Sequence, residues 1–334
     1  MPAEYTSNPD LKTILPEEEW RGTPLDVEGN FVNHEYPFIP KFSELWKWQR
    51  ETNPQKAEKK QDTWRLQASR DHDWLTNGKD CIVWLGHSTF FFRLNGVTLL
   101  TDPVFGSPSV LMKRYVDFPL DPTLLKNLDF ILLSHDHRDH LDEPSLQLLA
   151  KQNPDAQYLT GLKMNELLQK ITSSKHIQTA GWYQQYALGD TPLEVYFLPA
   201  RHWSRRGLWD INQRLWGAFV LKTNDLTIYF SGDTGYGSHL KEVGTIFPNI
   251  DYCIIGIGAY KPEWFMSPAH ISPTDAVKAF HEMQAKHLIP MHYGTFDLSD
   301  EPLSEPPAIL QQLKDEGKIK GNLCLPQPGE AIYL

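Results

Sequence analysis

Four side chains of metal-binding type lie within a short stretch of this chain. They are His135, His137, Asp139 and His140. The stretch follows Phe130–Ser134, an apolar run that is typical of a buried strand. Ionisable groups crowded against a buried strand would be costly without a compensating cation. Imidazole and carboxylate suit zinc, with iron, manganese or nickel as alternatives, so the stretch predicts an open metal site of the catalytic kind.

Three further histidine or aspartate residues occupy the same place relative to an expected strand. They are His202 after residues 195–201, Asp233 after residues 228–232, and His292 after residues 288–291. A layered α/β fold gathers the ends of its strands at one edge, so residues far apart in the sequence meet there. Taken singly, each of the three would more often be structural. Their shared position favours one centre that also includes His135.

Short β-rich runs punctuated by turns begin at Cys81. Asn95-Gly96, between residues 87–94 and 97–101, predicts a tight hairpin, because both residues tolerate the positive φ of a type I′ turn. A second hairpin is expected from residues 217–222 and 226–231. Helical spacing occurs at residues 144–151, 162–171, 273–284 and 307–313, the third with Ser272 and Pro273 as N-cap and first helical residue. Strands and helices interleave, which predicts an α/β fold.

The first part of the chain differs in composition from the rest. Residues 1–79 are rich in proline, charged residues and tryptophan, and we expect them to form an N-terminal arm that wraps around the domain. A short helix is expected at residues 42–48, where Phe42, Leu45 and Trp46 share one face. The charged tract 51–61 is expected to be a solvated helix or a linker. Residues 80–334 form the expected catalytic domain.

The overall composition is that of a folded globular protein. Hydrophobic residues make up 40% and charged residues 22% of the 334 positions, which argues against a disordered or fibrous chain. The net charge is −10, so nucleic acid is not expected to be a partner. The apolar stretch 82–100 is interrupted by polar residues and falls short of a membrane span.

The cysteines and the N-terminal sequence bear on the cellular compartment. Cys81, Cys253 and Cys324 are far apart and lack CxxC spacing, which predicts neither a disulfide framework nor a thiolate zinc site. The first residues lack the basic and apolar regions of a secretory signal. We therefore expect a cytoplasmic protein, with peripheral membrane association as an open alternative.

The HxHxDH string of residues 135–140 resembles the signature of the metallo-β-lactamase superfamily, and His202, Asp233 and His292 match its remaining ligand positions in order. Within that superfamily, the chain resembles the N-acylphosphatidylethanolamine-hydrolysing phospholipases D over roughly residues 80–307. The matching strings include Trp84-Leu-Gly-His-Ser-Thr, Leu100-Thr-Asp-Pro-Val-Phe, Pro199-Ala-Arg-His-Trp, Ser231-Gly-Asp-Thr-Gly-Tyr and His292-Tyr-Gly-Thr-Phe. The resemblance implies an α/β fold of the metallo-β-lactamase-like αββα sandwich type.

The resemblance also implies two zinc ions per chain and a role for each ligand. His135, His137 and His202 would hold the first ion, Asp139, His140 and His292 the second, and Asp233 would bridge both. Asp139 and Asp233 would act in catalysis, with Asp139 orienting or deprotonating the attacking water. His270 would be both catalytic and substrate-binding, in contact with the phosphate or the leaving oxygen.

Residues next to the ligands have expected supporting roles. Asp102, in Thr-Asp-Pro, is a candidate acceptor for the free N–H of a ligand histidine, with an ordinary turn aspartate as the alternative. His87 is a second candidate of this kind, with core packing as its alternative. Arg201 and Arg205 flank His202 and are candidates for binding an anionic headgroup, with a solvated basic patch as the alternative.

The implied reaction is attack of a metal-bridging hydroxide on the phosphorus of N-acylphosphatidylethanolamine, which releases N-acylethanolamine and phosphatidic acid. An apolar approach for such a lipid is expected from Phe105, Val110, Leu111, Met112, Trp203 and Leu208. Two alternatives remain open: a metal-dependent lactonase or hydrolase of a soluble phosphorylated metabolite, and a non-catalytic, metal-stabilised binding module. The resemblance further implies a homodimer.

Overall fold

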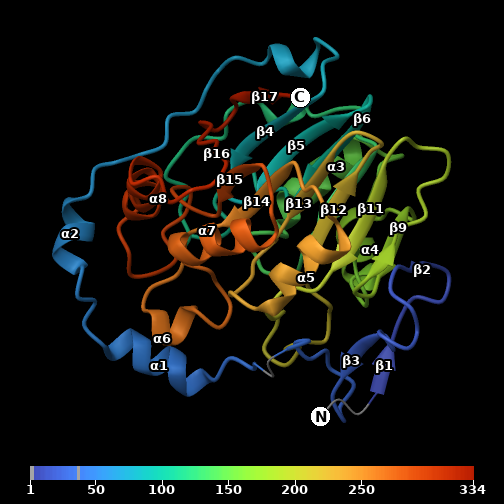
Figure 1. The fold of residues 1–334 in the computed structure, drawn as a ribbon, viewed down its shortest axis with the longest axis horizontal. Coiled ribbons are helices and arrows are strands. Elements are labelled where there is room, and N and C mark those ends of the chain that lie inside the picture. The colour runs from blue at the N-terminus through green and yellow to red at the C-terminus, as the bar shows by residue number, and fades with distance from the viewer. Residues whose placement is uncertain (1–3, 36–37) are drawn as a thin grey trace.

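The computed structural model describes residues 4–35 and 38–334, and in it two β-sheets pack face to face with helices on both outer sides (Figure 1). Helices α3 (Glu143–Gln152) and α4 (Asn165–Thr172) pack on one sheet. Helices α5 (Ser238–Ile246), α7 (Pro273–Glu282) and α8 (Glu305–Asp315) pack on the other. This arrangement is the αββα sandwich that the sequence led us to expect.

The first sheet has the strand order β17-β4-β5-β6-β7-β8-β9. Its strands are β4 (Cys81–Gly86), β5 (Thr89–Leu94), β6 (Val97–Thr101), β7 (Phe130–Leu133), β8 (Gln157–Gly161), β9 (Ile177–Ala180) and β17 (Ala331–Tyr333). Strands β4, β5 and β6 pair antiparallel, whereas β6 to β9 run parallel to one another. The predicted hairpin is confirmed, with Asn95 and Gly96 at positive φ, but its first strand begins at Thr89 because His87 and Ser88 form the preceding turn.

The second sheet has the strand order β16-β15-β14-β13-β12-β11-β10-β2. Its strands are β2 (Lys12–Thr13), β10 (Gln184–Gln185), β11 (Glu194–Leu198), β12 (Ala218–Lys222), β13 (Thr227–Phe230), β14 (Tyr252–Gly256), β15 (His287–Met291) and β16 (Asn322–Leu323). The predicted second hairpin is confirmed as the antiparallel pair β12–β13. Strands β11, β13, β14 and β15 all run in the same direction.

Strand β4 shows how one run of residues fills two cores. All of its residues are buried. Ile82 and Trp84 join the core that includes the second sheet, whereas Cys81, Val83 and Leu85 join the core beneath α3 and α4. Because successive side chains of a strand point to opposite faces, the continuous apolar run is explained by a strand covered on both sides.

The predicted helices are present, with shifted boundaries. The side chain of Ser272 accepts a hydrogen bond from the backbone of Asp275 at the start of α7, which confirms the predicted N-cap. The expected helix at 162–171 begins only at Asn165. Leu162 still donates its backbone N–H to Ala180, and Lys163 has a φ of 64°, which a right-handed helix does not accommodate.

The N-terminal residues run around the rim of the two sheets (Figure 1). They contain β1 (Glu4–Thr6), β3 (Thr23–Leu25), α1 (Phe42–Arg50), α2 (Lys56–Gln61) and the 3₁₀ turn η1 (Asp73–Leu75). The expected helix at 42–48 is confirmed as α1, and α2 lies within the charged tract. Helix α1 packs on α6 (Glu263–Met266), where the rings of Trp48 and Phe265 stack with centroids 5.2 Å apart.

Phe31 of this arm is completely buried in the same core as the second sheet. The arm and the second sheet thus share a core. The division of the chain at residue 80 into an arm and a catalytic domain stays a prediction. Within the described ranges, no helix combines the length and apolar character needed to cross a bilayer.

Candidate metal centre

The predicted ligands lie at one edge of the sandwich because the strands that precede them run in the same direction. In the first sheet, Asp102 follows β6 and His135 comes just after β7, its parallel neighbour. In the second sheet, His202, Asp233 and His292 come just after β11, β13 and β15. Loops that follow parallel strands meet at the carboxyl edge of a sheet. Both sheets present that edge to the same place, where side chains from the two sheets lie within ligand distance of one another.

Three imidazoles converge on one side of this edge. Nε2 of His135 lies 3.0 Å from Nδ1 of His137. Nε2 of His202, which comes from the other sheet, lies 3.1 Å from the same Nδ1 atom. The structure therefore brings together the three histidines that were expected to hold the first ion.

Asp233 lies between these imidazoles and a second group. Its Oδ1 lies 3.2 Å from Nε2 of His140, and its Oδ2 lies 3.1 Å from Nε2 of His292. Oδ2 is also 3.9 Å from Nε2 of His202. Asp139 completes the second group, with its Oδ2 3.7 Å from Nε2 of His140 and 3.8 Å from that of His292. All seven predicted ligands are thus brought together.

Hydrogen bonds behind the ligands decide which ring nitrogen carries the proton. Nδ1 of His140 lies 2.9 Å from Oδ2 of Asp102, and Nδ1 of His202 lies 2.9 Å from the carbonyl oxygen of Ala269. Because a carboxylate and a carbonyl can only accept, both Nδ1 atoms donate. Nε2 of both rings therefore faces the site, where it can bind a metal once it carries no proton.

Ser134 extends this arrangement to a third ligand. Its hydroxyl donates to Oδ2 of Asp102 at 2.6 Å and accepts from Nδ1 of His135 at 2.9 Å. Ser134 and Ala269 were not among the predicted site residues. A serine directly before the first histidine was the available signal for one of them, and a backbone carbonyl leaves no signal in the sequence.

Several nitrogens at the centre of the cluster have no hydrogen-bond partner among residues 4–35 and 38–334. They include Nε2 of His140 and Nε2 of His292, which are buried and lie 3.1–3.2 Å from the Asp233 oxygens without forming a hydrogen bond. A buried polar atom without a partner costs about 1–3 kcal/mol. A cation bound by these lone pairs would remove that cost. The residues present therefore fit divalent metal ions.

Burial and nearby charge set the protonation of the ligands. Burial holds the pKa of His135 and of His202 well below its ordinary value, so both rings are neutral at pH 7. Burial alone would raise the pKa of Asp233, but His140 and His292 bring it well below its ordinary value. Neutral imidazole and ionised carboxylate are the forms that bind a metal.

His87 lies against a candidate ligand. Its Nε2 is 3.1 Å from Oδ2 of Asp139, and its ring is buried. Burial lowers the pKa of His87 to about 3, so the ring is neutral at pH 7 and donates to the carboxylate. His87 reaches this position from the turn between β4 and β5, which lies at the same edge of the first sheet.

The backbone is in an uncommon conformation at three residues of the site. His87, Asp102 and His292 have φ values of 53°, 35° and 62°. Positive φ is rare for residues other than glycine and collects at functional sites. Gly232, next to Asp233, has a φ of 54°, and a Cβ atom there would lie 2.8 Å from Cβ of Ser134. A side chain at Gly232 would therefore displace the serine that orients His135.

The predicted substrate contacts lie at the rim of the cluster. His270 has its Nδ1 3.7 Å from Oδ2 of Asp233, and its side chain is 19% exposed. Arg201 directs Nη1 to the carbonyl oxygen of Tyr236 at 2.7 Å. Arg205 directs Nε to a backbone carbonyl of its own loop at 2.9 Å. The structure therefore brings His270 to the cluster, while these two arginines flank His202 with bonds to the backbone.

Two loops beside the cluster expose large apolar side chains. Val110 and Leu111, in the loop after β6, are 87% and 93% exposed. Leu208 and Trp209, in the loop after β11, are 76% and 89% exposed. Phe105, Met112 and Trp203, which were expected to belong to the same approach, are half-buried. Exposed apolar side chains grouped in this way are typical of a surface that contacts an apolar partner.

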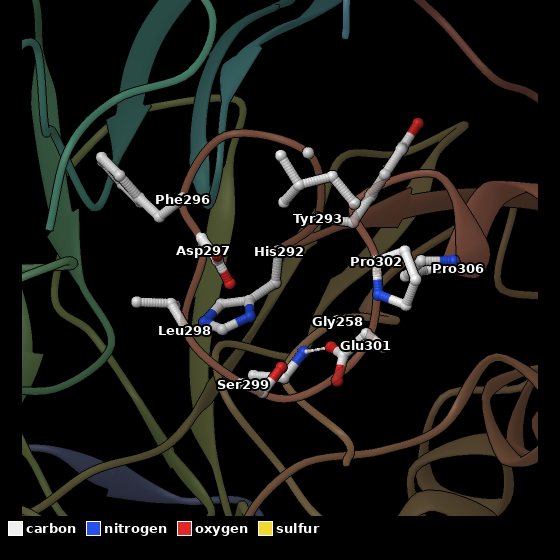
Figure 2. A pocket seen from close by; sticks show the side chains of 13 residues that line it. Gly258, His292, Tyr293, Phe296, Asp297, Leu298, Ser299, Glu301, Pro302 and Pro306 are labelled. Carbon is white, nitrogen blue, oxygen red and sulfur yellow. Dashed lines mark hydrogen bonds between the residues drawn. The ribbon is translucent and has the colours of Figure 1, made fainter. Parts of the chain in front are cut away.

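A small cleft lies beside His292, and the loop after β15 lines it (Figure 2). Glu301 of this loop accepts a hydrogen bond from the backbone N–H of Ala259 at 2.6 Å, which joins the loops after β14 and β15. Lys59 of α2 lies 2.5 Å from a carboxylate oxygen of Asp297. The loop that carries His292 is therefore held both by its neighbour and by the N-terminal arm.

A family model described as a beta-lactamase superfamily domain matches residues 98–293, which is more than half of the chain. The chain belongs to the metallo-β-lactamase superfamily. A metallo hydrolase from the archaeon Ignicoccus hospitalis is similar in structure, with a TM-score of 0.59. It is 18% identical in sequence, and the similar region covers 77% of this chain and 98% of the archaeal one, so the likeness concerns the fold.

Two relatives of this superfamily member are named as N-acyl-phosphatidylethanolamine-hydrolyzing phospholipases D. The one from Caenorhabditis elegans is 32% identical over 246 residues, which cover 70% of this chain and 69% of that protein. The mitochondrial one from Saccharomyces cerevisiae is 32% identical over 271 residues, which cover 76% and 56%. With these relatives and this fold, the protein is a metal-dependent hydrolase.

Proposed function

We propose that this superfamily member is a zinc-dependent phosphodiesterase of the phospholipase D type that hydrolyses N-acylphosphatidylethanolamine. The observation that carries the proposal is the position of Asp233 between two groups of imidazoles, 3.1–3.9 Å from histidines of both groups. Two adjacent cation sites suit in-line displacement at phosphorus. The similarity to the two phospholipases D and the exposed apolar loop tips support a lipid phosphodiester as the substrate.

Two metal ions fit the available donors. His135, His137 and His202 would hold one ion, Asp139, His140 and His292 the other, and Asp233 would contact both. Zinc suits these donors, with iron, manganese or nickel as alternatives. When bound, such ions supply a nucleophile by lowering the pKa of coordinated water towards 7 and neutralise the phosphodiester oxygens.

The residues of the chain have separate tasks in the proposed reaction. Water adds to phosphorus, the bond from phosphorus to the ethanolamine oxygen breaks, and that oxygen takes up a proton. Asp139, held by His87, is placed to accept the proton from the attacking water. Burial lowers the pKa of His270 to about 4, so at pH 7 its neutral ring can donate a hydrogen bond to the phosphoryl or leaving oxygen. The products are phosphatidic acid and N-acylethanolamine.

A lipid substrate requires the enzyme to meet a membrane surface. We propose that the tips formed by Val110 and Leu111 and by Leu208 and Trp209 insert among lipid headgroups during turnover. Arg205 lies on the same loop as Leu208, where it would favour an anionic surface. Assembly into a homodimer stays a prediction.

The experiment that tests the proposal combines metal analysis with a hydrolysis assay resolved by headgroup. The purified full-length chain is expected to hold two metal ions, to lose activity on chelation and to regain it with zinc. Vesicles containing N-acylphosphatidylethanolamine are expected to yield phosphatidic acid. In water labelled with ¹⁸O, the label is expected in phosphatidic acid, because the proposed attack is on phosphorus.

Two results would contradict the proposal. Less than about one metal ion per chain would be incompatible with a binuclear centre. Metal binding without turnover of any phospholipid, but with turnover of lactones or soluble phosphate esters, would instead assign the same centre to the alternative substrate classes.

A further inference from the structure

One side chain of the N-terminal arm reaches the candidate metal centre. Asn33 is 5% exposed. The nitrogen and the oxygen of its side-chain amide both contact His202, in the loop after β11. Its Nδ2 donates to the carbonyl oxygen of His202 at 2.8 Å. The backbone N–H of His202 donates to Oδ1 of Asn33 at 3.1 Å. The side-chain amide thus pairs with the peptide groups of His202 as a neighbouring strand would.

His202 lies beyond the end of β11, and Asn33 is the hydrogen-bond partner that the described part of the chain offers to its backbone N–H and carbonyl oxygen. The ring of His202 is held separately, by the bond from Nδ1 to the carbonyl oxygen of Ala269. Asn33 therefore fixes the backbone of His202, and Ala269 fixes its ring. Together they aim Nε2 of His202 at the imidazoles of the first sheet.

The position of Asn33 is itself fixed on both sides. The completely buried Phe31 donates its backbone N–H to Asn212 in the loop after β11. Glu35 accepts a hydrogen bond from the backbone N–H of Ser238 at 2.9 Å, in the segment after Asp233. The arm therefore spans the two loops that carry His202 and Asp233, with Asn33 between these anchors.

We propose that Asn33 is a positioning residue for the metal ligand His202. The inference rests on the binuclear centre proposed above. A ligand must be held in place against thermal motion, and loss of a supporting hydrogen bond typically weakens metal affinity by about 10- to 100-fold. The N-terminal arm thereby becomes part of the metal centre as well as of the fold.

The test compares metal binding by the full-length chain and three variants. Asn33→Asp keeps the size and the acceptor but replaces the donor to His202, and Asn33→Ser shortens the side chain. Asn30→Ala is the matched control, because the hydrogen bonds that the structure shows for the Asn30 side chain stay within its own turn, to Asp26 and Glu28. Zinc affinity is measured in competition with a chelator, and the visible spectrum of the cobalt-loaded protein reports ligand geometry.

We expect both Asn33 variants to fold, to bind one of the two zinc ions about 10- to 100-fold more weakly, and to show an altered cobalt spectrum. Asn30→Ala should match the unmodified chain in both measurements. Unchanged affinity and spectrum in both Asn33 variants would overturn the inference, as would loss of the fold in both when zinc is present. If the unmodified chain itself bound no metal, the proposed function would fail instead.

Discussion

Oδ2 of Asp102 lies 2.9 Å from Nδ1 of His140, and neither side chain is exposed to solvent. Asp102 also accepts hydrogen bonds from the backbone N–H of Ser134 at 2.8 Å and from its hydroxyl at 2.6 Å. Through Ser134, the same carboxylate orients His135. One buried aspartate at the end of β6 therefore sets the proton positions of two candidate ligands, one in each proposed metal set.

Asp102→Asn is expected to weaken metal binding and to lower kcat/KM by about 10- to 100-fold, because an NH₂ group replaces one accepting oxygen and the side chain can no longer accept all three hydrogen bonds from His140 and Ser134. The measurements are metal content after dialysis and hydrolysis of a soluble phosphodiester. Asp129→Asn is the control: Asp129 bonds Thr98 at the opposite end of β6. Equal metal content and rate in the two variants would contradict the role of Asp102.

Asp233→Asn is expected to reduce bound metal below two ions per chain and to lower hydrolysis by at least about a thousandfold, equivalent to ~4 kcal/mol. The reason is that an amide lacks the charge and the second anionic oxygen that place Asp233 between His140 and His292. Elemental analysis and initial rates measure the two effects. Turnover at the unmodified rate would refute the bridging position.

His87→Phe is expected to lower kcat by roughly tenfold with little change in KM, because the ring contacts Asp139 and holds its carboxylate by a hydrogen bond. His87→Gln keeps a donor and should retain more activity than His87→Phe. Steady-state kinetics on a soluble phosphodiester separate the two constants. Equal kcat values for the two variants would show that His87 serves only to fill space.

Replacing Leu208 and Trp209 together by serine is expected to weaken binding to anionic vesicles and to slow hydrolysis of vesicle lipid, because both side chains are largely exposed beside the centre. The rate of hydrolysis of a soluble phosphodiester should change by less than about twofold, which is within assay error. Leu124→Ser, at the half-exposed 3₁₀ turn η2 (Pro122–Leu124), is the control. Undiminished vesicle binding would show that Leu208 and Trp209 do not contact the membrane.

Glu35→Gln is expected to destabilise the protein by about 1 kcal/mol at pH 7, after allowance for solvent screening, and by less as the pH falls from 4.5 towards 2. Partial burial opposes ionisation, but the His239 ring, 3.8 Å away, and hydrogen bonds from Ser238 lower the pKa of Glu35 from 4.5 to about 2. The stabilisation is therefore complete above pH 4.5 and is lost in acid. Denaturant unfolding across this range measures it, with the exposed Glu17→Gln as control. A difference independent of pH would contradict the assignment.

Local signals in the sequence determined much of the fold. Asn95-Gly96 predicted a hairpin because its turn needs positive φ, and the Ser272 N-cap located the start of α7. The boundary of α4 was wrong because Lys163 adopts a left-handed conformation that its residue type does not signal. Such conformations are imposed by packing between strands and helices.

The sequence also determined the chemistry of the site. The side-chain types of His135, Asp139 and their neighbours, placed after a buried strand, predicted a metal centre without any structure, because crowded ionisable groups require a cation. The sequence did not show which residues form the hydrogen bonds that hold those groups. Asp102 and His140 are separated by 38 positions, and Asn33 and His202 by 169.

Only the tertiary structure brings such residues within hydrogen-bond distance. The packing of the two sheets, and the course of the arm around them, place Asn33 on His202 and the carbonyl of Ala269 on its ring. No local preference of an asparagine or of a backbone carbonyl reports a partner so far along the chain. The residue types thus determined what the site can bind, whereas the meeting of two sheet edges decided how each ligand is held.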